Sequence, residues 1–158
     1  MLKKLAATAT AGTIAWAGVS AIDHTTRDDS GQIVTAGDLG AFVTKVGDCL
    51  NGLSSDKSTV DVIQGVPCTE AHHWQVIYKD NLNLSSFSEE AVSQGANQVC
   101  SPIIDSLINN LSDSQLAEYQ NAEVQTLQPT SESWAHEDRV VDCLIGSNSD
   151  TYFTSILE

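Results

Sequence analysis

Apolar residues in this chain follow two different spacings. Between positions 88 and 107 they recur every three or four residues, which predicts an amphipathic helix with one buried face. Ser88, followed by two glutamates, is suited to start that helix, while Pro102 predicts a kink or a restart inside it. Five shorter runs alternate apolar with polar residues, or gather β-branched and aromatic ones, and predict strands: 59–63, 74–78, 122–127, 139–145 and 151–157.

The order of these elements predicts an α+β domain. Two strands come first, one or two helices follow, and three strands close the chain. The second helix is expected at 112–119, where Ser112 and Gln115 have the spacing of a capping box. The first two strands and the last two are close enough in sequence to form hairpins. We therefore expect a mostly antiparallel sheet, in the order β-β-α-α-β-β-β, with the helices packed on one face.

The stretch from 129 to 145 combines a turn with the clearest strand. Pro129 is a turn former, and the hydroxyl residues after it could cap a short helical turn that carries Trp134. Alternate residues of the following strand point to opposite faces of the sheet. One face carries Val141, Cys143 and Ile145, and the other carries Val140, Asp142 and Leu144. We expect Trp134 to act as a large apolar anchor for this sheet.

The beginning of the chain has the charge pattern of an exported protein. Lys3 and Lys4 precede an uncharged run at 5–22, which Asp23 ends. All 21 acidic residues lie beyond that run with five basic ones, so this part of the chain has a net charge of −16. Positive charge before an apolar run and acid after it predict that the bulk of the chain crosses a membrane.

Two fates of the apolar run are open. It is just long enough to remain as a transmembrane anchor, and its small residues favour packing against other transmembrane helices. Val19-Ser20-Ala21 also offers a cleavage site, and cutting there would give a secreted, free domain. We expect retention in the cell membrane as a single pass, with a cytoplasmic N-terminus and the domain on the outer face.

The expected organisation therefore has three parts. Residues 1–22 are the anchor or signal peptide, and residues 23–45 are an extracytoplasmic tether, because they are polar and punctuated by glycine. One short pairing segment is expected in the tether at 32–35. Residues 46–158 form the folded domain.

The four cysteines are spread across the expected domain: Cys49, Cys68, Cys100 and Cys143. None belongs to a Cys-x-x-Cys pair, and an even number of cysteines in an exported chain predicts two disulfides. Four cysteines allow three connectivities, and the sequence leaves all three open.

One group of residues has borderline spacing for a zinc site. It consists of Cys68, His72 and His73, and Cys49 lies upstream. A zinc site of this kind needs cysteine thiolates, however, and an oxidising compartment converts them to disulfides. We predict no metal and no cofactor.

The residue types of a catalytic triad occur together at Ser133 or Ser131 with His136 and Asp138. Residues so close together in one turn rarely meet in triad geometry, and the chain has no Gly-x-Ser-x-Gly elbow. We predict a protein without catalytic activity. The alternative is a cell-envelope hydrolase or ligand-binding enzyme that uses the turn at 134–138.

The net charge restricts the class of partner. A strongly acidic domain repels nucleic acid and anionic lipid headgroups, so we expect neither to bind it. A basic protein surface is the expected partner, although charge of this sign also serves simple solubility.

Several short motifs together resemble the actinobacterial septum formation domain family. They are Val46-Gly47-Asp48-Cys49-Leu50, Val66-Pro67-Cys68-Thr69-Glu70-Ala71-His72, the helical Cys100, and Pro129-Thr130-Ser131-Glu132-Ser133-Trp134 with Asp138-Arg139-Val140-Val141-Asp142-Cys143-Leu144. The resemblance covers about residues 24–158, and the last motif is its specific part. The sequence departs from the family pattern at Ala71, where members often have proline, and at Glu137, where a glycine would ease the turn.

The resemblance implies an extracytoplasmic, disulfide-containing domain on one membrane anchor. The family name implies a link to cell division and no particular reaction. The matching motif residues are expected to be structural: Asp48, Pro129, Trp134, Asp138 and Arg139. Asp138 and Arg139 would orient Trp134 through a local salt bridge or turn bond.

The most economical pairing of the cysteines joins Cys49 to Cys68 across the first strand and loop. Cys100 on the helix is then left to reach Cys143 on the strand beneath it. For function, we expect a non-enzymatic accessory or interaction subunit of a larger cell-envelope membrane complex, in division, envelope synthesis or a respiratory assembly. Its partners would be other membrane proteins of that complex.

Overall fold

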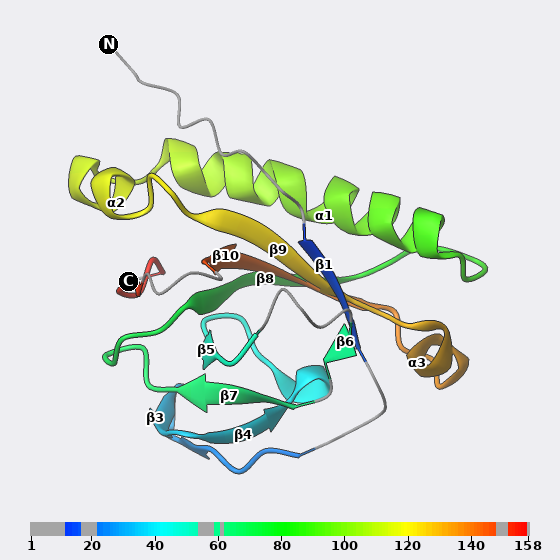
Figure 1. Cartoon of the computed structure of the whole chain (residues 1–158), viewed down its shortest axis with the longest axis horizontal. Helices are drawn as coiled ribbons and strands as arrows, with labels where there is room; N and C mark the ends of the chain where they lie inside the picture. The colour runs from blue at the N-terminus through cyan, green and yellow to red at the C-terminus, as the bar shows by residue number, and fades with distance from the viewer. Residues whose placement is uncertain (1–11, 17–21, 54–58, 61, 148–151, 158) are drawn as a thin grey trace.

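A computed structural model of the chain describes residues 12–16, 22–53, 59–60, 62–147 and 152–157. Its centre is one eight-stranded sheet (Figure 1). Across the sheet the strands are β4 (Gly37–Gly40), β7 (Val62–Val66), β5 (Cys49–Asn51), β8 (Trp74–Asn81), β10 (Val140–Gly146), β9 (Glu123–Gln128), β1 (Gly12–Trp16) and β6 (Thr59–Val60). From β4 to β9 all neighbours are antiparallel, whereas β1 is parallel to both β9 and β6. The predicted α+β class and mostly antiparallel sheet are confirmed.

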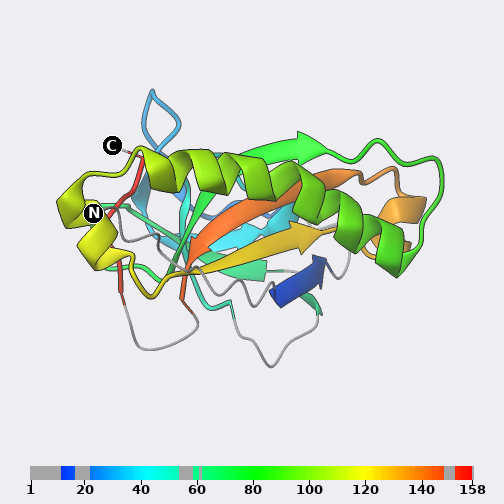
Figure 2. The same cartoon turned by 90° about the horizontal axis from the view of Figure 1, so that it is seen from above.

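The helices α1 (Glu89–Asn109) and α2 (Asp113–Glu118) lie on one face of the sheet, as Figure 2 shows from above. The short helix α3 (Ser131–Ala135) connects β9 to β10, and the 3-10 turn η1 (Ala41–Val43) packs on the other face. The sheet therefore separates two apolar cores. Val141, Cys143 and Ile145 of β10 face α1, while Leu144 faces the core that contains η1. This is the division of faces that the alternation in 139–145 predicts.

The helix α1 begins as predicted but passes through its proline. The Ser88 hydroxyl accepts a hydrogen bond from the Ala91 N–H at 3.1 Å, which caps the first turn. Pro102 lies inside the continuous helix, so the predicted restart at this point is wrong. Proline removes one backbone hydrogen bond. Ala96 and Ile104, on either side of it, are both buried against the sheet, and this packing holds the two halves in one helix.

Neither predicted hairpin is present, and the predicted order β-β-α-α-β-β-β is wrong, because more than two strands precede α1 and two strands, not three, follow α2 within the described residues. β7 and β8 do not pair with each other, because β5 lies between them and bonds to both. The segment after β10 forms no strand within the described residues 152–157, apart from one bridge between Phe153 and His72. Instead, side chains hold it: the Ile156 N–H donates to Gln75 Oε1 at 2.8 Å, and the Phe153 ring stacks on Tyr119.

The segment predicted as a tether is folded onto the domain. Its first part forms a small two-stranded sheet of β2 (Thr26–Arg27) and β3 (Ile33–Thr35), so pairing at 32–35 is confirmed. Its second part adds β4 to the main sheet and buries Leu39 completely. The polar residues of this segment suggest that it faces solvent, but Ile33, Leu39 and Ala41 lie in the core on the η1 side of the sheet.

Part of the predicted anchor, Gly12–Trp16, is the strand β1 and not a helix. Its β-branched and aromatic residues suit a strand as well as a membrane span, so hydrophobicity alone could not distinguish them. Within the described residues, no helix has the length and apolar character needed to cross a membrane. The other residues of the predicted anchor, 1–11 and 17–21, lie outside the described residues.

Both favoured disulfides form. Cys49 on β5 is bonded to Cys68, with sulfurs 2.03 Å apart. Cys100 on α1 is bonded to Cys143 on β10, so this second bond fastens the helix to the sheet through the core.

Candidate functional site

The turn between β9 and β10 is built by a reciprocal cap. The Thr130 hydroxyl accepts from the Ser133 N–H at 3.0 Å, and the Ser133 hydroxyl oxygen accepts from the Thr130 N–H at 2.9 Å. Pro129 is buried at the end of β9, where its fixed geometry leads into the cap. The five-residue helix α3 is thus fixed by its first residues, and it places Trp134 in the core.

Asp138 closes the same turn from the other side. Its carboxylate accepts from the Ser133 hydroxyl at 2.8 Å and from the Val140 N–H at 2.9 Å. Only 4% of Asp138 is exposed. Burial raises the pKa of this carboxyl, while the bonds from Val140 and Ser133 lower it. Its bonds therefore tie the end of α3 to the start of β10.

Arg139 lies over the face of Trp134, with the guanidinium carbon 3.5 Å from the ring centroid. The guanidinium also donates to the Trp134 carbonyl at 2.9 Å and to the Asp138 carbonyl at 2.7 Å. A cation at this distance is attracted by the π electrons of an indole. Trp134 is further enclosed by Phe87, whose ring centroid is 5.8 Å away. Arg139 therefore orients Trp134 by turn bonds and stacking.

The turn contains one strained backbone position. Glu137 is exposed and has a φ of 67°, a left-handed conformation that favours glycine. We expect Glu137→Gly to raise the free energy of unfolding by about 0.5–1 kcal/mol, measured by urea denaturation. Glu132→Gly is the matched control, since the same exchange inside α3 should lower stability by about 1 kcal/mol. Loss of stability in both variants would contradict the assignment of strain to Glu137.

The second family motif forms a clamp on the N-terminal segment. Asp48 is 4% exposed and binds Arg27 with two parallel bonds, of 2.7 and 2.8 Å. It also accepts from the Lys45 N–H at 2.8 Å. These bonds to Asp48 are the main reason that the pKa of Arg27 is raised. Gly47, with a φ of 95°, supplies the left-handed turn before Asp48.

A third charged group was not found from the sequence. Asp142 on β10 is fully buried, and its carboxylate accepts from the Thr44 hydroxyl. The other carboxylate oxygen lies 3.1 Å from Lys79 Nζ, an ion pair without the angles of a hydrogen bond. Lys79 Nζ itself donates to the Thr44 carbonyl at 2.7 Å. Alternation places Asp142 on the face opposite Cys143, but nothing in the sequence links it to Thr44, 98 positions earlier.

Asp142 makes stability depend on pH. Burial raises its pKa to about 6, while Lys79 and Thr44 act in the opposite direction. Since the unfolded carboxyl titrates near pH 4, the folded state binds more protons between pH 4 and 6, and stability falls as pH rises through that window. Compared with Asp142→Asn, the natural protein should lose on the order of 2 kcal/mol from pH 4 to 7. Urea unfolding of both proteins across this range measures the difference, and parallel curves would contradict it.

The predicted nucleophilic group is only partly assembled. Ser133 and Asp138 meet directly, with the serine donating to the carboxylate. His136 caps the end of α3 through its backbone N–H and is exposed, and Ser131 is exposed at the start of the same helix. A histidine between serine and carboxylate is what activates a triad nucleophile. In this structure the direct bond between Ser133 and Asp138 stabilises the turn between β9 and β10.

The residues of the borderline zinc group make other interactions. Cys49 and Cys68 use both sulfurs in their disulfide. His72 is fully buried, its Nδ1 lies 2.9 Å from the Glu70 carbonyl, and burial lowers its pKa. His73 stacks on Tyr152. Within the described parts of the chain, no three His, Cys, Asp or Glu side chains gather as metal ligands would.

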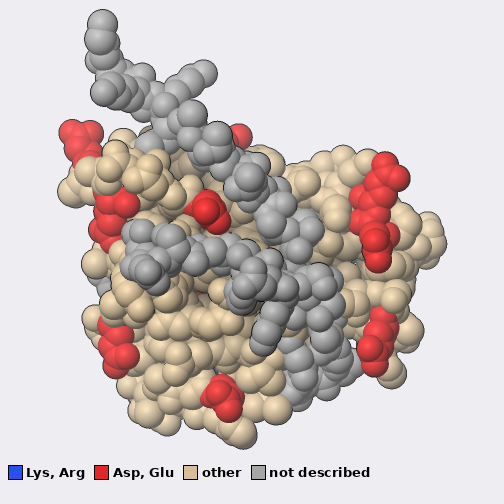
Figure 3. Space-filling model, viewed as in Figure 1, with Lys and Arg blue, Asp and Glu red and all other residues tan. Residues whose placement is uncertain are grey.

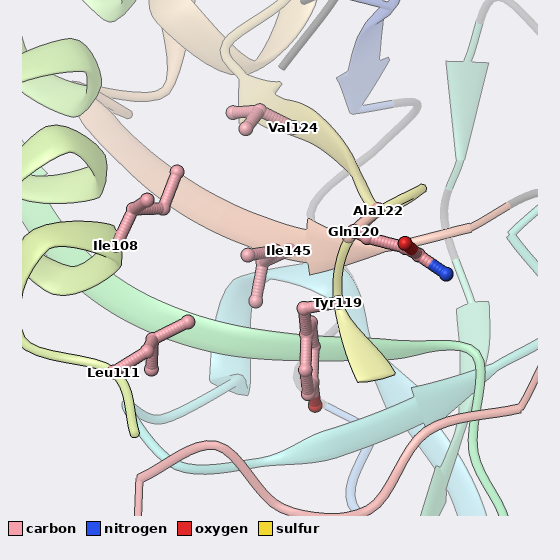
Figure 4. Close-up of a pocket in the computed structure, with 7 residues that line it drawn as sticks. All are labelled: Ile108, Leu111, Tyr119, Gln120, Ala122, Val124 and Ile145. Atoms are coloured by element: carbon pink, nitrogen blue, oxygen red, sulfur yellow. The ribbon is translucent and has the colours of Figure 1, made fainter. Parts of the chain in front are cut away.

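An apolar depression lies between the end of α1 and the sheet (Figure 4). It measures about 310 Å³, counting space open to solvent, and is lined by Ile108, Leu111, Tyr119, Gln120, Ala122, Val124 and Ile145. The Tyr119 hydroxyl already donates to the Thr154 carbonyl. Ligand sites usually add several convergent polar groups to an apolar wall, and this lining offers few.

The surface is acidic because acidic residues outnumber basic ones, and because most of the described basic side chains contact groups of the domain. Twelve of the described carboxylates are exposed, and Figure 3 shows several spread over one face, with no described lysine or arginine among them. Arg27 and Lys79 are paired with buried aspartates, and Arg139 lies on Trp134. Lys45 is the remaining described cation, and it is exposed. Few described basic side chains therefore balance the exposed carboxylates.

The motif residues thus serve one geometry: they hold α3, β10 and the N-terminal segment in place. Comparison with known proteins agrees with the resemblance in those motifs. Searches among curated proteins and among solved structures gave no match. A family model described as septum formation matches residues 18–143, which include the clamp at Asp48 and the turn before β10. Since this match spans most of the chain, the protein belongs to the septum formation family.

Proposed function

We propose that this protein is a non-enzymatic accessory subunit on the outer face of the cell membrane, where its acidic domain binds a basic surface of a larger membrane complex. Membership of the septum formation family suggests a role in cell division or in the cell envelope. The charge pattern of residues 1–23 supports export with an N-terminal anchor. The two disulfides support an oxidising compartment outside the cytoplasm.

The distribution of charge carries this proposal. Three of the four described cations contact partners inside the domain, so the exposed acids have few basic side chains to balance them. An unbalanced acidic surface attracts a basic protein from a distance and speeds its association. The same surface repels nucleic acid and anionic lipid headgroups.

The absence of catalysis is supported by what the polar motif residues do. Ser133 and Asp138 satisfy each other, and Asp48 is saturated by Arg27 and a backbone N–H. Residues that hold a turn or a clamp are not free to take up a proton from a substrate. These bonds support our proposal that the protein binds a partner by its outer surface and does not catalyse a reaction.

The proposal is tested with the full chain expressed in membranes, extracted in mild detergent and cross-linked. We expect the protein to migrate with other membrane proteins at low salt and to separate from them at high salt, because salt screens exposed charges. A monomer at low salt, or a protein recovered from the cytosol, would contradict the proposal.

Two charge reversals locate the contact. Asp105 is exposed on α1, and Asp38 is exposed on β4, on the opposite side of the molecule (Figure 1). If one face binds the partner, Asp105→Lys or Asp38→Lys should weaken association at least tenfold, and the other variant serves as its control. Equal association of both variants and the natural protein, at all salt concentrations, would show that the acidic surface serves solubility only.

A further inference from the structure

The strand β1 lies between β9 and β6 in the sheet, and β6 joins the sheet only through β1. It runs parallel to β9, with Gly12 opposite Gln125 and Ala15 opposite Gln128. On its other side it runs parallel to β6, with Trp16 opposite Val60. Figures 1 and 2 show β1 beside β9 in both views. We name the position of β1, bounded by β9 and β6, the strand slot.

The strand that occupies the slot belongs to the segment that export would take away from the domain, either into the membrane or by cleavage. Residues 12–16 belong to the apolar run at 5–22, which the proposed function places in the membrane. If the run is cleaved instead, these residues are lost as well. The inference rests on the proposed export, and in either case the slot of the exported domain is left without β1.

An empty slot would expose an unprotected strand edge. The residues of β9 from Val124 to Gln128 carry no charge and no proline, the two features by which edge strands usually avoid pairing. Three polar atoms of β9, Gln125 Oε1, Thr126 Oγ1 and Gln128 Oε1, are buried and lack a hydrogen-bond partner within the described residues. Backbone groups in such an edge need partners, and an added strand supplies them.

We propose that the strand slot of the exported domain binds an extended, uncharged segment of a partner protein, parallel to β9. The position of β1 shows that the slot admits a strand with apolar and small residues. A segment with hydroxyl or amide side chains opposite Gln125 and Thr126 would also satisfy their free oxygens. Basic residues beside the segment would suit the acidic surface.

The test uses the full chain inserted in phosphatidylcholine nanodiscs and a labelled peptide with the sequence of residues 11–18, flanked by lysines. We expect the peptide to bind the nanodiscs that contain the protein and not empty ones. The control peptide carries Ile14→Pro, which removes a strand N–H and should bind at least tenfold more weakly. Hydrogen exchange at residues 125–128 should slow at least tenfold when the first peptide is added.

If the two peptides bind equally, or if hydrogen exchange at 125–128 does not change, the proposal that the slot binds a strand is wrong. If the natural protein forms a dimer and the peptide dissociates it, a second copy of the chain supplies the strand. That result would overturn the proposal that a different protein occupies the slot. Protease accessibility of the domain on intact cells tests export independently. If export fails, the proposed function falls. If export holds and the peptide does not bind, only the strand slot is wrong.

Discussion

Replacing Cys100 and Cys143 together with alanine should lower the free energy of unfolding by about 4 kcal/mol. The bond between them closes a chain separation of 43 residues and fastens α1 to β10. Cross-linking a long loop restricts the unfolded chain, and the restriction grows with the length of the loop. Both cysteines are at most 2% exposed, so this bond also lies inside the core. Urea denaturation under oxidising conditions measures the loss.

The second disulfide provides the matched control. Cys49 and Cys68 are separated by 19 residues, for which the same relation gives about 3 kcal/mol. Cys68 is partly exposed, so mild reductant should open this bond before the buried one. A smaller loss for the Cys100–Cys143 variant than for the Cys49–Cys68 variant would show that the unfolded chain is not the main source of the stabilisation.

Asp48→Ala should lower stability by about 3 kcal/mol, because it leaves the Arg27 guanidinium in a largely buried position with half of its bonds. The Arg27 side chain is only 11% exposed, and its two bonds to Asp48 are 2.7 and 2.8 Å long. The clamp joins the first part of the segment at 22–45, which contains β2 and β3, to the turn before β5 by side-chain bonds, whereas β4 is held separately by its pairing with β7. Its loss should therefore release β2 and β3 before the rest of the fold.

Two measurements examine this result. Urea denaturation gives the change in stability, and hydrogen exchange at 26–35 should speed up more than exchange in β10. Asp29→Ala is the control, since Asp29 is an exposed carboxylate in the same segment and should change stability by less than about 0.5 kcal/mol. If the two variants behave alike, the Arg27–Asp48 pair does not hold the segment.

The structural part of the candidate site was predictable only where its residues are neighbours in sequence. The cap at Thr130 and the turn that ends at Arg139 lie within ten residues, and hydroxyl residues before Trp134 already indicate them. Glu137 stands where a glycine would ease the turn, and it is the one non-glycine residue with a left-handed backbone in the described chain. The partner of Asp48 lies 21 positions away in a segment that reads as a tether, so the clamp could not be predicted.

The misplaced elements have a common cause. Alternation identifies a strand but does not identify its neighbour, so the insertion of β5 between β7 and β8 was not predictable. An apolar run suits a membrane helix and a buried strand equally well, which is why the sequence did not predict the strand at Gly12–Trp16. The final segment, 152–157, alternates like a strand but is held by the side chains of Gln75 and Tyr119.

The sequence by itself determined the α+β class, the caps of the helices, the two faces of β10 and the family. These are local properties, because periodicity, capping and motifs depend on residues a few positions apart. Only the tertiary structure decided the order of the strands, the bonds of Arg27 and Asp142, and the place of β1 beside β9. Each of these joins residues far apart in the chain, and such pairs are selected by packing and burial of the whole domain.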